Sequence, residues 1–509
     1  MIEKADDYFS RRMEMQILDK TALEIGKELQ AKTISVKEVI DEVYESYKKE
    51  DGAVNAYSSF DIEAAMSEAD RAQKLIDSGE ACSPLAGVPI GIKDNISTKG
   101  LPTTCASKIL EGFRPPFDAT AVEKIKKAGM VIAGKMNMDE FAMGSTSETS
   151  CYGPVHNPWN LDHVPGGSSG GAAAAVAAGE AVCTLGSDTG GSIRQPASYC
   201  GVTGFKPTYG AVSRYGLIAY ASSLDQIGPV GADVLDCAAI MDVISGLDSK
   251  DSTSKDLTSG KYYGYDKSYL ESMTGDVKGL TIGLPEECFG EGVDPETKSG
   301  VENAVKTLES LGAKVKNINL PFIRYAVPTY YIIATAEASS NLSRFDGVKY
   351  GYRTEKYHTL DELIVNTRSE GFGAEVRKRI LLGTFVLSSG YYDAYYNKAL
   401  KMKQMIVNGF KKAYEECDLI VCPTSPMTAP KIGSSLADSM KMYLSDIFTV
   451  SVNLAGLPGL SIPCGLDRNG LPIGTQIIGA SGSDKMVLNA GHAFQKVTDF
   501  HKKRPGGVE

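Results

Sequence analysis

Two serine-bearing glycine loops flank an alanine-rich tract, and no other feature of the chain constrains its fold as strongly. The loops are VPGGSSGG at 164–171 and GSDTGGS at 186–192, and the alanine-rich tract covers 172–178. Alanine is the strongest helix former, Gly179 is a natural place for a helix to end, and the apolar run Ala181–Leu185 suits a buried strand. The segment therefore predicts a loop, a helix, a strand and a second loop in succession.

Short apolar runs alternate with helical periods over the rest of the chain. The runs that suit buried strands are 129–134, 181–185, 280–284, 419–422 and 460–463. The stretches with a helical period are 36–49, 61–79, 119–128, 295–311 and 485–497. Ser35 is the expected N-cap of the first helix, and Asp51 and Gly52 form a turn signal after it. The alternation predicts an α/β fold in which helices cover both faces of a mixed or largely parallel sheet.

Charge and cysteine content exclude several classes of protein. The formal net charge of −10 repels phosphate backbones, so direct nucleic-acid binding by this chain is not expected. Ten cysteines are too few for a disulfide scaffold. Cys183, Cys200, Cys422 and Cys464 lie in apolar or glycine-rich surroundings, as buried free thiols do. We expect a cytoplasmic protein in a reducing environment.

The sequence contains no export, membrane or metal-binding signal. No apolar run approaches the roughly 20 residues that a bilayer span requires, and the first residues have no basic region that leads into an apolar one. Cys417 and Cys422 are spaced too widely for a zinc knuckle and have no matching second pair. We predict no metal site and no cofactor bound by this chain.

The two glycine loops and an upstream lysine indicate a serine nucleophile. A serine hydroxyl needs a base within hydrogen-bond reach, and the five histidines offer no obvious one. Lys93 follows the apolar stretch 88–92, where burial would lower its pKa enough for it to act as the base. Ser168 is the candidate relay between this lysine and the nucleophile Ser192.

The second loop also has the composition of an oxyanion hole. Glycine lets successive backbone amides turn inward without a Cβ clash, so the amides of Thr189, Gly190, Gly191 and Ser192 could hold a developing negative charge. The run 166–170 formally satisfies G-x-S-x-G, which would instead make Ser168 the nucleophile. That motif requires an apolar strand just before it, and 157–163 is not one.

Three motifs resemble the amidase signature family. They are GVPIGIKD at 87–94, GGSSGG at 166–171 and DTGGSIR at 188–194. In that family the lysine is the base, the first serine of GGSSGG is the relay and follows a cis peptide bond, and the serine of the GGS motif is the nucleophile. The resemblance implies these roles for Lys93, Ser168 and Ser192.

Later segments are similar to one branch of that family, the glutaminase subunits (A subunits) of glutamyl-tRNA(Gln) amidotransferases. The similar stretches include 137–144, 201–207, 214–216, 330–334, 339–347, 379–385 and 453–459, and the resemblance covers roughly residues 20–500. It implies hydrolysis of L-glutamine through a γ-glutamyl ester on serine. It also implies that Arg379 grips the substrate carboxylate and Asp446 its ammonium group, with Tyr330 and Asp188 in the same pocket.

The resemblance further implies partners and a domain arrangement. A B subunit would use ATP and Mg²⁺ at its own site, bind most of the misacylated tRNA and receive the ammonia. A C subunit would complete a heterotrimer, and Asp-tRNA(Asn) could be a second acceptor. We predict a helical segment at 1–60, a catalytic domain at 61–500 and a tail at 501–509. The Ser–Ser–Lys core would lie at about 80–235 and the glutamine pocket at about 320–480.

Two alternatives stay open at the level of the sequence. One is a stand-alone amidase that uses the same three residues on apolar or aryl amides. The other is a catalytically silent amidase fold that serves as an assembly subunit. An extension at about residues 1–19 has no assigned role, and 249–267 is the best candidate for a linker or an exposed excursion.

Overall fold

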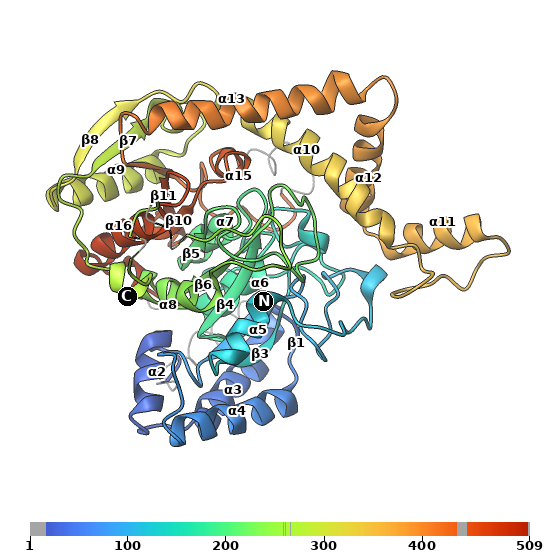
Figure 1. The fold of residues 1–509 in the computed structure, drawn as a ribbon, viewed down its shortest axis with the longest axis horizontal. Coiled ribbons are helices and arrows are strands. Elements are labelled where there is room, and N and C mark those ends of the chain that lie inside the picture. Colours follow the sequence, from blue (N-terminus) through green and yellow to red (C-terminus); the bar gives the residue numbers. More distant parts are fainter. Residues whose placement is uncertain (1–16, 258, 260, 265, 435–444, 507–509) are drawn as a thin grey trace.

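The protein folds around one mixed sheet of eleven strands (Figure 1). The computed structural model describes residues 17–257, 259, 261–264, 266–434 and 445–506. Most of the N-terminal extension, the residues just before Ser445 and the end of the predicted tail lie outside this described part. In spatial order the strands are β1-β3-β2-β4-β6-β5-β10-β11-β9-β7-β8. Strands β2, β3 and β4 are parallel neighbours, as are β7, β8 and β9, and antiparallel pairs join these groups.

The strands and helices have the following bounds. The strands are β1 Tyr57–Ser59, β2 Pro89–Lys93, β3 Val131–Met136, β4 Cys183–Asp188, β5 Thr203–Lys206, β6 Gln226–Gly231, β7 Thr281–Pro285, β8 Lys314–Ile318, β9 Leu419–Pro423, β10 Gly459–Leu466 and β11 Pro472–Gly479. The helices are α2 Ala22–Gln30, α3 Val36–Val54, α4 Ile62–Asp77, α5 Thr120–Lys127, α6 Gly170–Ala178, α7 Arg194–Cys200, α8 Val234–Ile244, α9 Pro295–Ser310, α10 Ala326–Asn341, α11 Leu360–Gly371, α12 Ala374–Leu387, α13 Asn397–Ala413, α15 Val450–Leu454 and α16 Asp484–Val497.

Helices cover both faces of the sheet, as the sequence predicts. On β4, Leu185 joins the large apolar core that includes α5, α8, α9 and α16, whereas Thr184 faces the other way and its hydroxyl donates to the Ala172 carbonyl of α6 at 3.0 Å. Successive residues of a strand point to opposite faces, so α6 and α8 lie on opposite sides of the sheet. Helices α10, α12 and α13 add an outer layer at the end remote from α2, α3 and α4 (Figure 1).

The helices predicted near the N-terminus form, but the turn predicted at Asp51 and Gly52, after the helix that begins at Val36, does not. Ser35 caps α3 in a reciprocal pair with Glu38, yet the helix continues through Gly52 and ends at Val54. Asn55, with φ of 57°, is the residue that ends it. The carboxylate of Asp51 accepts hydrogen bonds from the amides of Ala56 and Tyr57, so Asp51 stabilises the chain after the helix end instead of turning it earlier.

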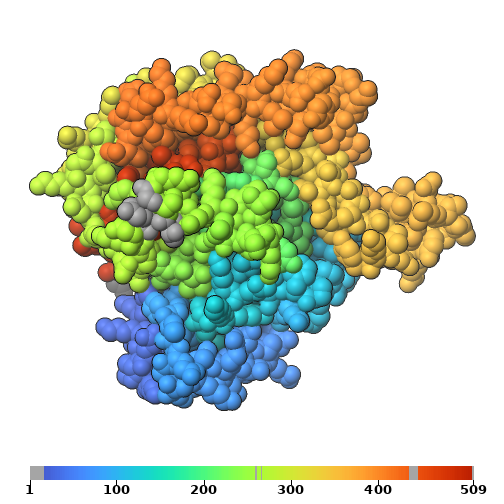
Figure 2. All heavy atoms as spheres, viewed as in Figure 1, coloured from blue at the N-terminus to red at the C-terminus, as the bar shows by residue number. Residues whose placement is uncertain are grey.

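The boundary predicted at residue 60 stays a prediction. Strand β1, at Tyr57–Ser59, pairs with β3 and therefore belongs to the central sheet. The described residues of 249–267 form bends and turns without helix or strand. The stretch around α11 projects furthest from the body of the molecule (Figures 1 and 2). Within the described residues, no helix has the length and apolar character needed to cross a bilayer.

Helix α6 brings the first glycine loop against the end of the sheet. All nine of its residues are buried, and it ends at Gly179 with φ of 72°, as expected. A Cβ on Gly171 would lie 2.3 Å from the Ala56 carbonyl oxygen and 2.4 Å from that of Asn137. The glycine and alanine content of this helix therefore allows the backbone approach that sets the position of the loop before it.

Candidate active site

Three segments that are far apart in the sequence meet at one edge of the sheet. Lys93 is the last residue of β2, Ser168 precedes α6, and Ser192 lies in the loop after β4. Strands β2 and β4 are parallel neighbours, so their C-terminal ends reach the same edge. The Ser169 amide donates to the Ser192 carbonyl at 3.1 Å, which ties the two glycine loops together.

The Lys93 ammonium group is enclosed by serine oxygens. Its side chain is fully buried. Nζ lies 2.7 Å from Ser168 Oγ, 2.8 Å from Ser169 Oγ and 3.3 Å from the Ser187 carbonyl. Burial lowers the pKa of Lys93 to about 7, although nearby Asp139 and Asp188 oppose the shift. A lysine in this state loses its proton readily at neutral pH and can serve as a base.

The loop before α6 presents two serines to this lysine, and reasoning from the sequence assigned a role to the first alone. The peptide bond from Gly167 to Ser168 is cis, as the resemblance implies. Ser169 was missed, although it also contacts Lys93 and its hydroxyl donates to the Ser187 carbonyl at 3.0 Å. Both serines are fully buried. The sequence did contain a signal for this residue, because Ser169 is the second serine of GGSSGG and immediately follows the proposed relay, Ser168.

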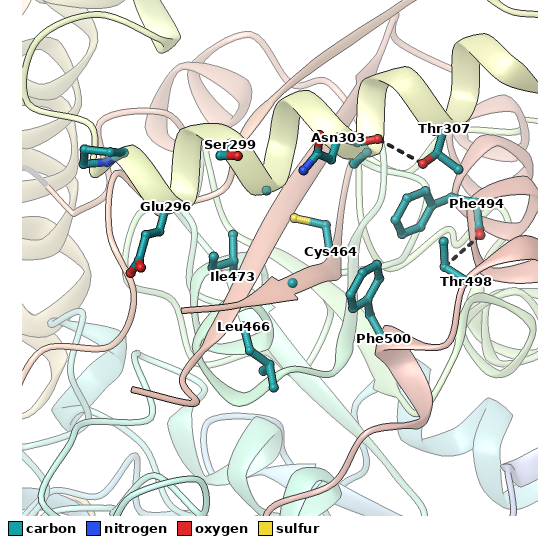
Figure 3. A pocket seen from close by; sticks show the side chains of 14 residues that line it. Glu296, Ser299, Asn303, Thr307, Cys464, Leu466, Ile473, Phe494, Thr498 and Phe500 are labelled. Carbon is teal, nitrogen blue, oxygen red and sulfur yellow. Dashed lines mark hydrogen bonds between the residues drawn. The ribbon is translucent and has the colours of Figure 1, made fainter. Parts of the chain in front are cut away.

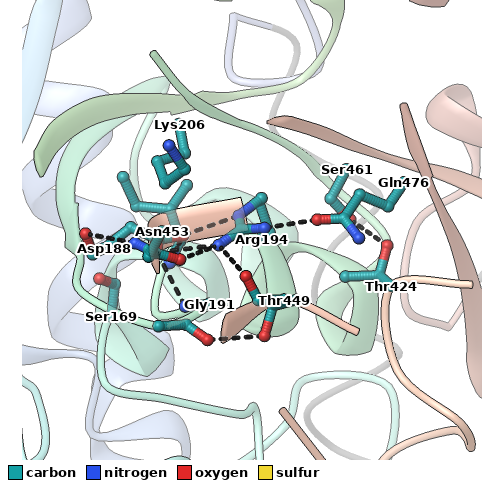
Figure 4. Close-up of polar contacts among 12 residues, drawn as sticks. Ser169, Asp188, Gly191, Arg194, Lys206, Thr424, Thr449, Asn453, Ser461 and Gln476 are labelled. Carbon is teal, nitrogen blue, oxygen red and sulfur yellow. Dashed lines mark hydrogen bonds and ion pairs between the residues drawn. The ribbon is translucent and has the colours of Figure 1, made fainter. Parts of the chain in front are cut away.

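Asp188 organises the loop that carries Ser192 (Figure 4). Its carboxylate accepts from the amides of Gly191 and Ile193 at 2.8 and 3.2 Å. It also accepts from Arg194 Nε at 3.0 Å and from Asn453 Nδ2 at 2.9 Å. Burial raises the pKa of Asp188, but the Arg194 guanidinium outweighs this effect and holds the pKa well below its usual range. These contacts do not support the expectation that Asp188 binds substrate, because its oxygens are occupied within the protein.

Three amides of the second loop remain available for an oxyanion. Among the described residues, the N–H groups of Thr189, Gly190 and Ser192 have no acceptor in the protein, whereas the Gly191 N–H is bound to Asp188. The Gly190 carbonyl accepts from Thr449 Oγ1 at 2.6 Å, which holds the peptide in place. Ser192 itself is 7% exposed, so it is accessible to a small substrate while Lys93 is not.

Arg379 lies on α12 and is almost fully buried, at 2% exposure. Nε donates to Glu375 Oε1 at 2.8 Å and Nη1 donates to the Tyr220 hydroxyl at 2.8 Å. Within the described residues, Nη2 is buried and has no hydrogen-bond acceptor. Buried donors are normally satisfied, so this atom marks a position where a ligand oxygen can bind.

Tyr220 connects Arg379 to the nucleophile loop, and reasoning from the sequence missed it. Its amide donates to Asp225 at 3.0 Å, and the same carboxylate accepts from Thr189 Oγ1 at 2.7 Å. The stretch around Tyr220 contains no recognisable motif, so no local signal could have identified it.

Asp446 and Tyr330 lie close to the same two loops. Asp446 accepts a hydrogen bond from Ser145 Oγ. Burial raises the pKa of Asp446 to about 7, while Ser145 and Arg379 oppose the shift. Tyr330, on α10, packs against Gly190 so closely that a Cβ there would lie 2.7 Å from the tyrosine ring.

Gln195 connects this side of the site to the relay loop. Its Nε2 donates to the Ser145 carbonyl at 3.0 Å, and its Oε1 accepts from the Gly167 amide at 2.9 Å. The structure thus brings all the predicted site residues into one neighbourhood, and it adds Ser145, Ser169 and Tyr220 to them.

A separate cavity of about 650 Å³ lies between α9, β10, β11 and α16 (Figure 3). Cys464 and Phe494 form part of its apolar wall, and Asn303 lies on its polar side. None of the residues that line it has a predicted role in the site. The described residues also contain no group of three or more histidine, cysteine or carboxylate side chains arranged to hold a metal ion.

Comparisons with known proteins agree in pointing to one family. The amidase family profile matches residues 38–488. The chain is 57% identical to the A subunit of the glutamyl-tRNA(Gln) amidotransferase of Lachnospira eligens, over 95% of this chain and 99% of that protein. It is 54% identical to the A subunit of the same enzyme in Agathobacter rectalis, over 96% of each chain.

A solved structure agrees with these sequence comparisons. The crystal structure of the A subunit of the glutamyl-tRNA(Gln) amidotransferase from Thermotoga maritima matches with a TM-score of 0.78 and 42% identity. The match covers 97% of this chain and 98% of that one. Since the profile spans most of the chain and the relatives match over almost their whole length, the protein belongs to the amidase family.

Proposed function

We propose that this chain is the glutaminase subunit of a tRNA-dependent amidotransferase. The observation that carries the proposal is the buried Arg379 guanidinium, whose Nη2 has no acceptor among the described residues, in the same neighbourhood as a buried lysine–serine pair. A pocket for apolar amides has no use for a buried cation with an open hydrogen-bond position. A substrate that carries its own carboxylate would satisfy this donor.

Free L-glutamine carries an α-carboxylate and an α-ammonium group, which complement the charges of Arg379 and Asp446. Its α-carboxylate would accept from Arg379 Nη2, and its α-ammonium group would pair with Asp446. The rings of Tyr220 and Tyr331 lie 5.6 and 5.3 Å from the Arg379 guanidinium carbon, so they keep the cation in place beside the substrate. Tyr330 would line the passage to the nucleophile loop.

The chemistry begins with neutral Lys93. As Ser192 Oγ attacks the side-chain carbonyl of glutamine, its proton passes to Ser168 Oγ, and Ser168 gives its own proton to Lys93 Nζ. The tetrahedral intermediate collapses when the carbon–nitrogen bond breaks, and the proton returns along the same path to the leaving ammonia. The product on the enzyme is a γ-glutamyl ester of Ser192, which water then hydrolyses to glutamate.

Backbone amides would stabilise the oxyanion of this intermediate. The N–H groups of Thr189, Gly190 and Ser192, which have no acceptor among the described residues, are the donors, at about 3 kcal/mol each by comparison with other oxyanion holes. We assign Gly191 and Asp188 to shaping the loop, because the Gly191 amide donates to the Asp188 carboxylate at 2.8 Å. Ser169 positions Lys93 through its hydrogen bonds to Nζ and to the Ser187 carbonyl.

Ammonia released here requires an acceptor held close by, since it protonates in bulk water and loses its nucleophilicity. The relatives in Lachnospira eligens and Agathobacter rectalis bear the name of the A subunit of a glutamyl-tRNA(Gln) amidotransferase. By this likeness, a B subunit that uses ATP and Mg²⁺ would pass the ammonia to misacylated tRNA, and a C subunit would complete the heterotrimer. A net charge of −10 suits a subunit that leaves tRNA binding to its partner.

Ammonia release by the purified chain tests the proposal. L-Glutamine is compared with an apolar primary amide, and the Ser192→Ala variant is compared with Ser310→Ala, which alters a serine at the end of α9. We expect glutamine turnover that Ser192→Ala abolishes and Ser310→Ala preserves. Preference for the apolar amide would instead indicate a stand-alone amidase, and absence of turnover even with the partner subunits would indicate an inactive scaffold.

A further inference from the structure

Glu140 is a buried carboxylate outside the residues that carry the proposed chemistry. It lies in a short turn after β3 and is 4% exposed. Its carboxylate accepts a hydrogen bond from Ser107 Oγ. It also accepts from the amide of Gly373, with 3.1 Å to Oε1 and 2.9 Å to Oε2. Gly373 is 233 residues away in the sequence and is the N-cap of α12.

Glu140 binds the N–H group of Gly373, the N-cap residue of α12. The first amides of a helix have no partner within the helix, and Gly373 has no side chain to bind them. A carboxylate at this position satisfies a donor and also interacts favourably with the positive end of the helix dipole. The fit is close, because a Cβ on residue 373 would lie 2.3 Å from Glu140 Oε2. The glycine therefore allows the carboxylate to reach the backbone.

Aromatic contacts support the same junction. The ring of Phe141 lies 5.6 Å from that of Phe372, in an edge-to-face arrangement, and 5.1 Å from that of Phe345. The segment after β3 is therefore in contact with the start of α12 through apolar packing as well as through the carboxylate.

Asp139, the residue before Glu140, connects this segment to the relay loop. Its amide donates to the Ser168 carbonyl at 3.2 Å, and its carboxylate accepts from the Ser147 amide at 2.9 Å. A Cβ on Gly167 would lie 2.0 Å from Asp139 Oδ2. Two adjacent residues thus contact the two halves of the site, Asp139 on the side of Ser168 and Glu140 on the side of α12.

Arg379 lies on the helix that begins at this junction. Arg379 lies six residues after Gly373, which is about 9 Å along the helix at 1.5 Å per residue. We propose that Glu140 is a positioning residue that sets the distance between Arg379 and the serine–lysine machinery, so that the site accepts an amide with the length and carboxylate of glutamine. The inference rests on the proposed glutaminase function.

Kinetics of the full-length chain with two probes test the inference. The first probe is L-glutamine, whose carboxylate would require Arg379. The second is covalent labelling of Ser192 by phenylmethanesulfonyl fluoride, an uncharged reagent that does not require Arg379. The variants are Glu140→Ala, Glu140→Gln and, as a matched control, Glu362→Gln. Glu362 Oε2 accepts from the His358 amide at 2.6 Å, next to the N-terminus of α11, and this helix bears no predicted site residue.

For Glu140→Ala we expect KM for glutamine to rise about tenfold, as the loss of one hydrogen bond to a charged group predicts. Turnover at saturating glutamine and the labelling rate should stay within about twofold of the unaltered chain. Glu140→Gln should show a smaller rise in KM, because its amide oxygen can still accept from Gly373. Glu362→Gln should match the unaltered chain. If Glu140→Ala does not fold, Ser107→Ala provides a second variant that removes a donor to the same carboxylate and should raise KM in the same direction.

Two results would overturn the inference while the unaltered chain still hydrolyses glutamine. One is an unchanged KM in Glu140→Ala. The other is a labelling rate that falls in proportion to kcat/KM, since that would indicate general structural damage. Absence of glutamine hydrolysis by the unaltered chain, even with its partner subunits, would instead overturn the proposed function and this inference with it.

Discussion

Replacing Arg379 with alanine separates glutamine recognition from the chemistry at Ser192. The guanidinium has two hydrogen bonds within the protein, to Glu375 and Tyr220, and one buried donor without an acceptor among the described residues. The substitution would leave the glutamine carboxylate in a buried site without a cation. It would also remove a positive charge that opposes the raised pKa of Asp446. Both effects weaken binding of the substrate and leave the catalytic lysine in place.

The expected magnitude follows from the burial of this pair. Loss of one partner from a buried, hydrogen-bonded charge pair costs roughly 2–5 kcal/mol. A value of about 3 kcal/mol corresponds to an increase of roughly 150-fold in KM for glutamine. Arg379→Lys should recover part of this loss, because lysine restores the charge without the planar fork of donors.

A coupled assay of ammonia release measures KM and kcat, and phenylmethanesulfonyl fluoride labelling measures the reactivity of Ser192 independently. Arg377→Ala is the matched control, since Arg377 is an exposed arginine on the same helix. The reasoning fails if KM for glutamine changes by less than about threefold, which is below the smallest effect expected for a buried charge pair. It also fails if the labelling rate falls in parallel with kcat/KM.

Two further predictions follow from the buried charges. At pH values below 7, log kcat/KM for glutamine should increase with pH, with a slope approaching two. Both Lys93 and Asp446 must lose a proton, and both pKa values are about 7. Labelling by phenylmethanesulfonyl fluoride should rise with a slope of one, since it requires only Lys93, and equal slopes in a pH series would contradict these assignments. Asp188→Asn should lower the free energy of unfolding by roughly 3–5 kcal/mol, because it leaves the buried Arg194 without its anion. It should also lower kcat, because asparagine replaces one of the two carboxylate oxygens that accept from the Gly191 and Ile193 amides of the nucleophile loop. Urea denaturation and turnover measurements check this prediction, and an unchanged unfolding midpoint would refute it.

Much of the fold could be predicted from local patterns. The alanine tract forms α6 and ends at Gly179, and the apolar runs near 131, 183, 281, 419 and 459 form strands of the sheet. The spacing of apolar residues and the preference of each residue type for helix or strand act over a few residues, so both can be judged from the sequence. The turn predicted at Asp51 and Gly52 does not form, because α3 continues through both residues to Val54 and the Asp51 carboxylate accepts from the Ala56 amide beyond the helix end.

The sequence by itself determined which chemical groups are available. It contains two glycine loops that can present amides, serines within those loops, and a lysine that directly follows an apolar strand. A serine hydroxyl needs a base, and this requirement, together with the apolar stretch before Lys93 and the lack of an obvious histidine, led to Lys93.

Tertiary structure decided how those groups are used, because a side chain's hydrogen-bond partners depend on distances in space and not on spacing along the chain. Burial at the sheet edge is what lowers the pKa of Lys93. The carboxylate of Asp188, for which the resemblance implies substrate binding, accepts from Asn453, 265 residues away, and from the Gly191 amide of the nucleophile loop. The contact of Glu140 with Gly373 could not be predicted from local sequence patterns either. Both carboxylates accept hydrogen bonds from residues that are far away in the sequence and that only the packing of the fold brings close.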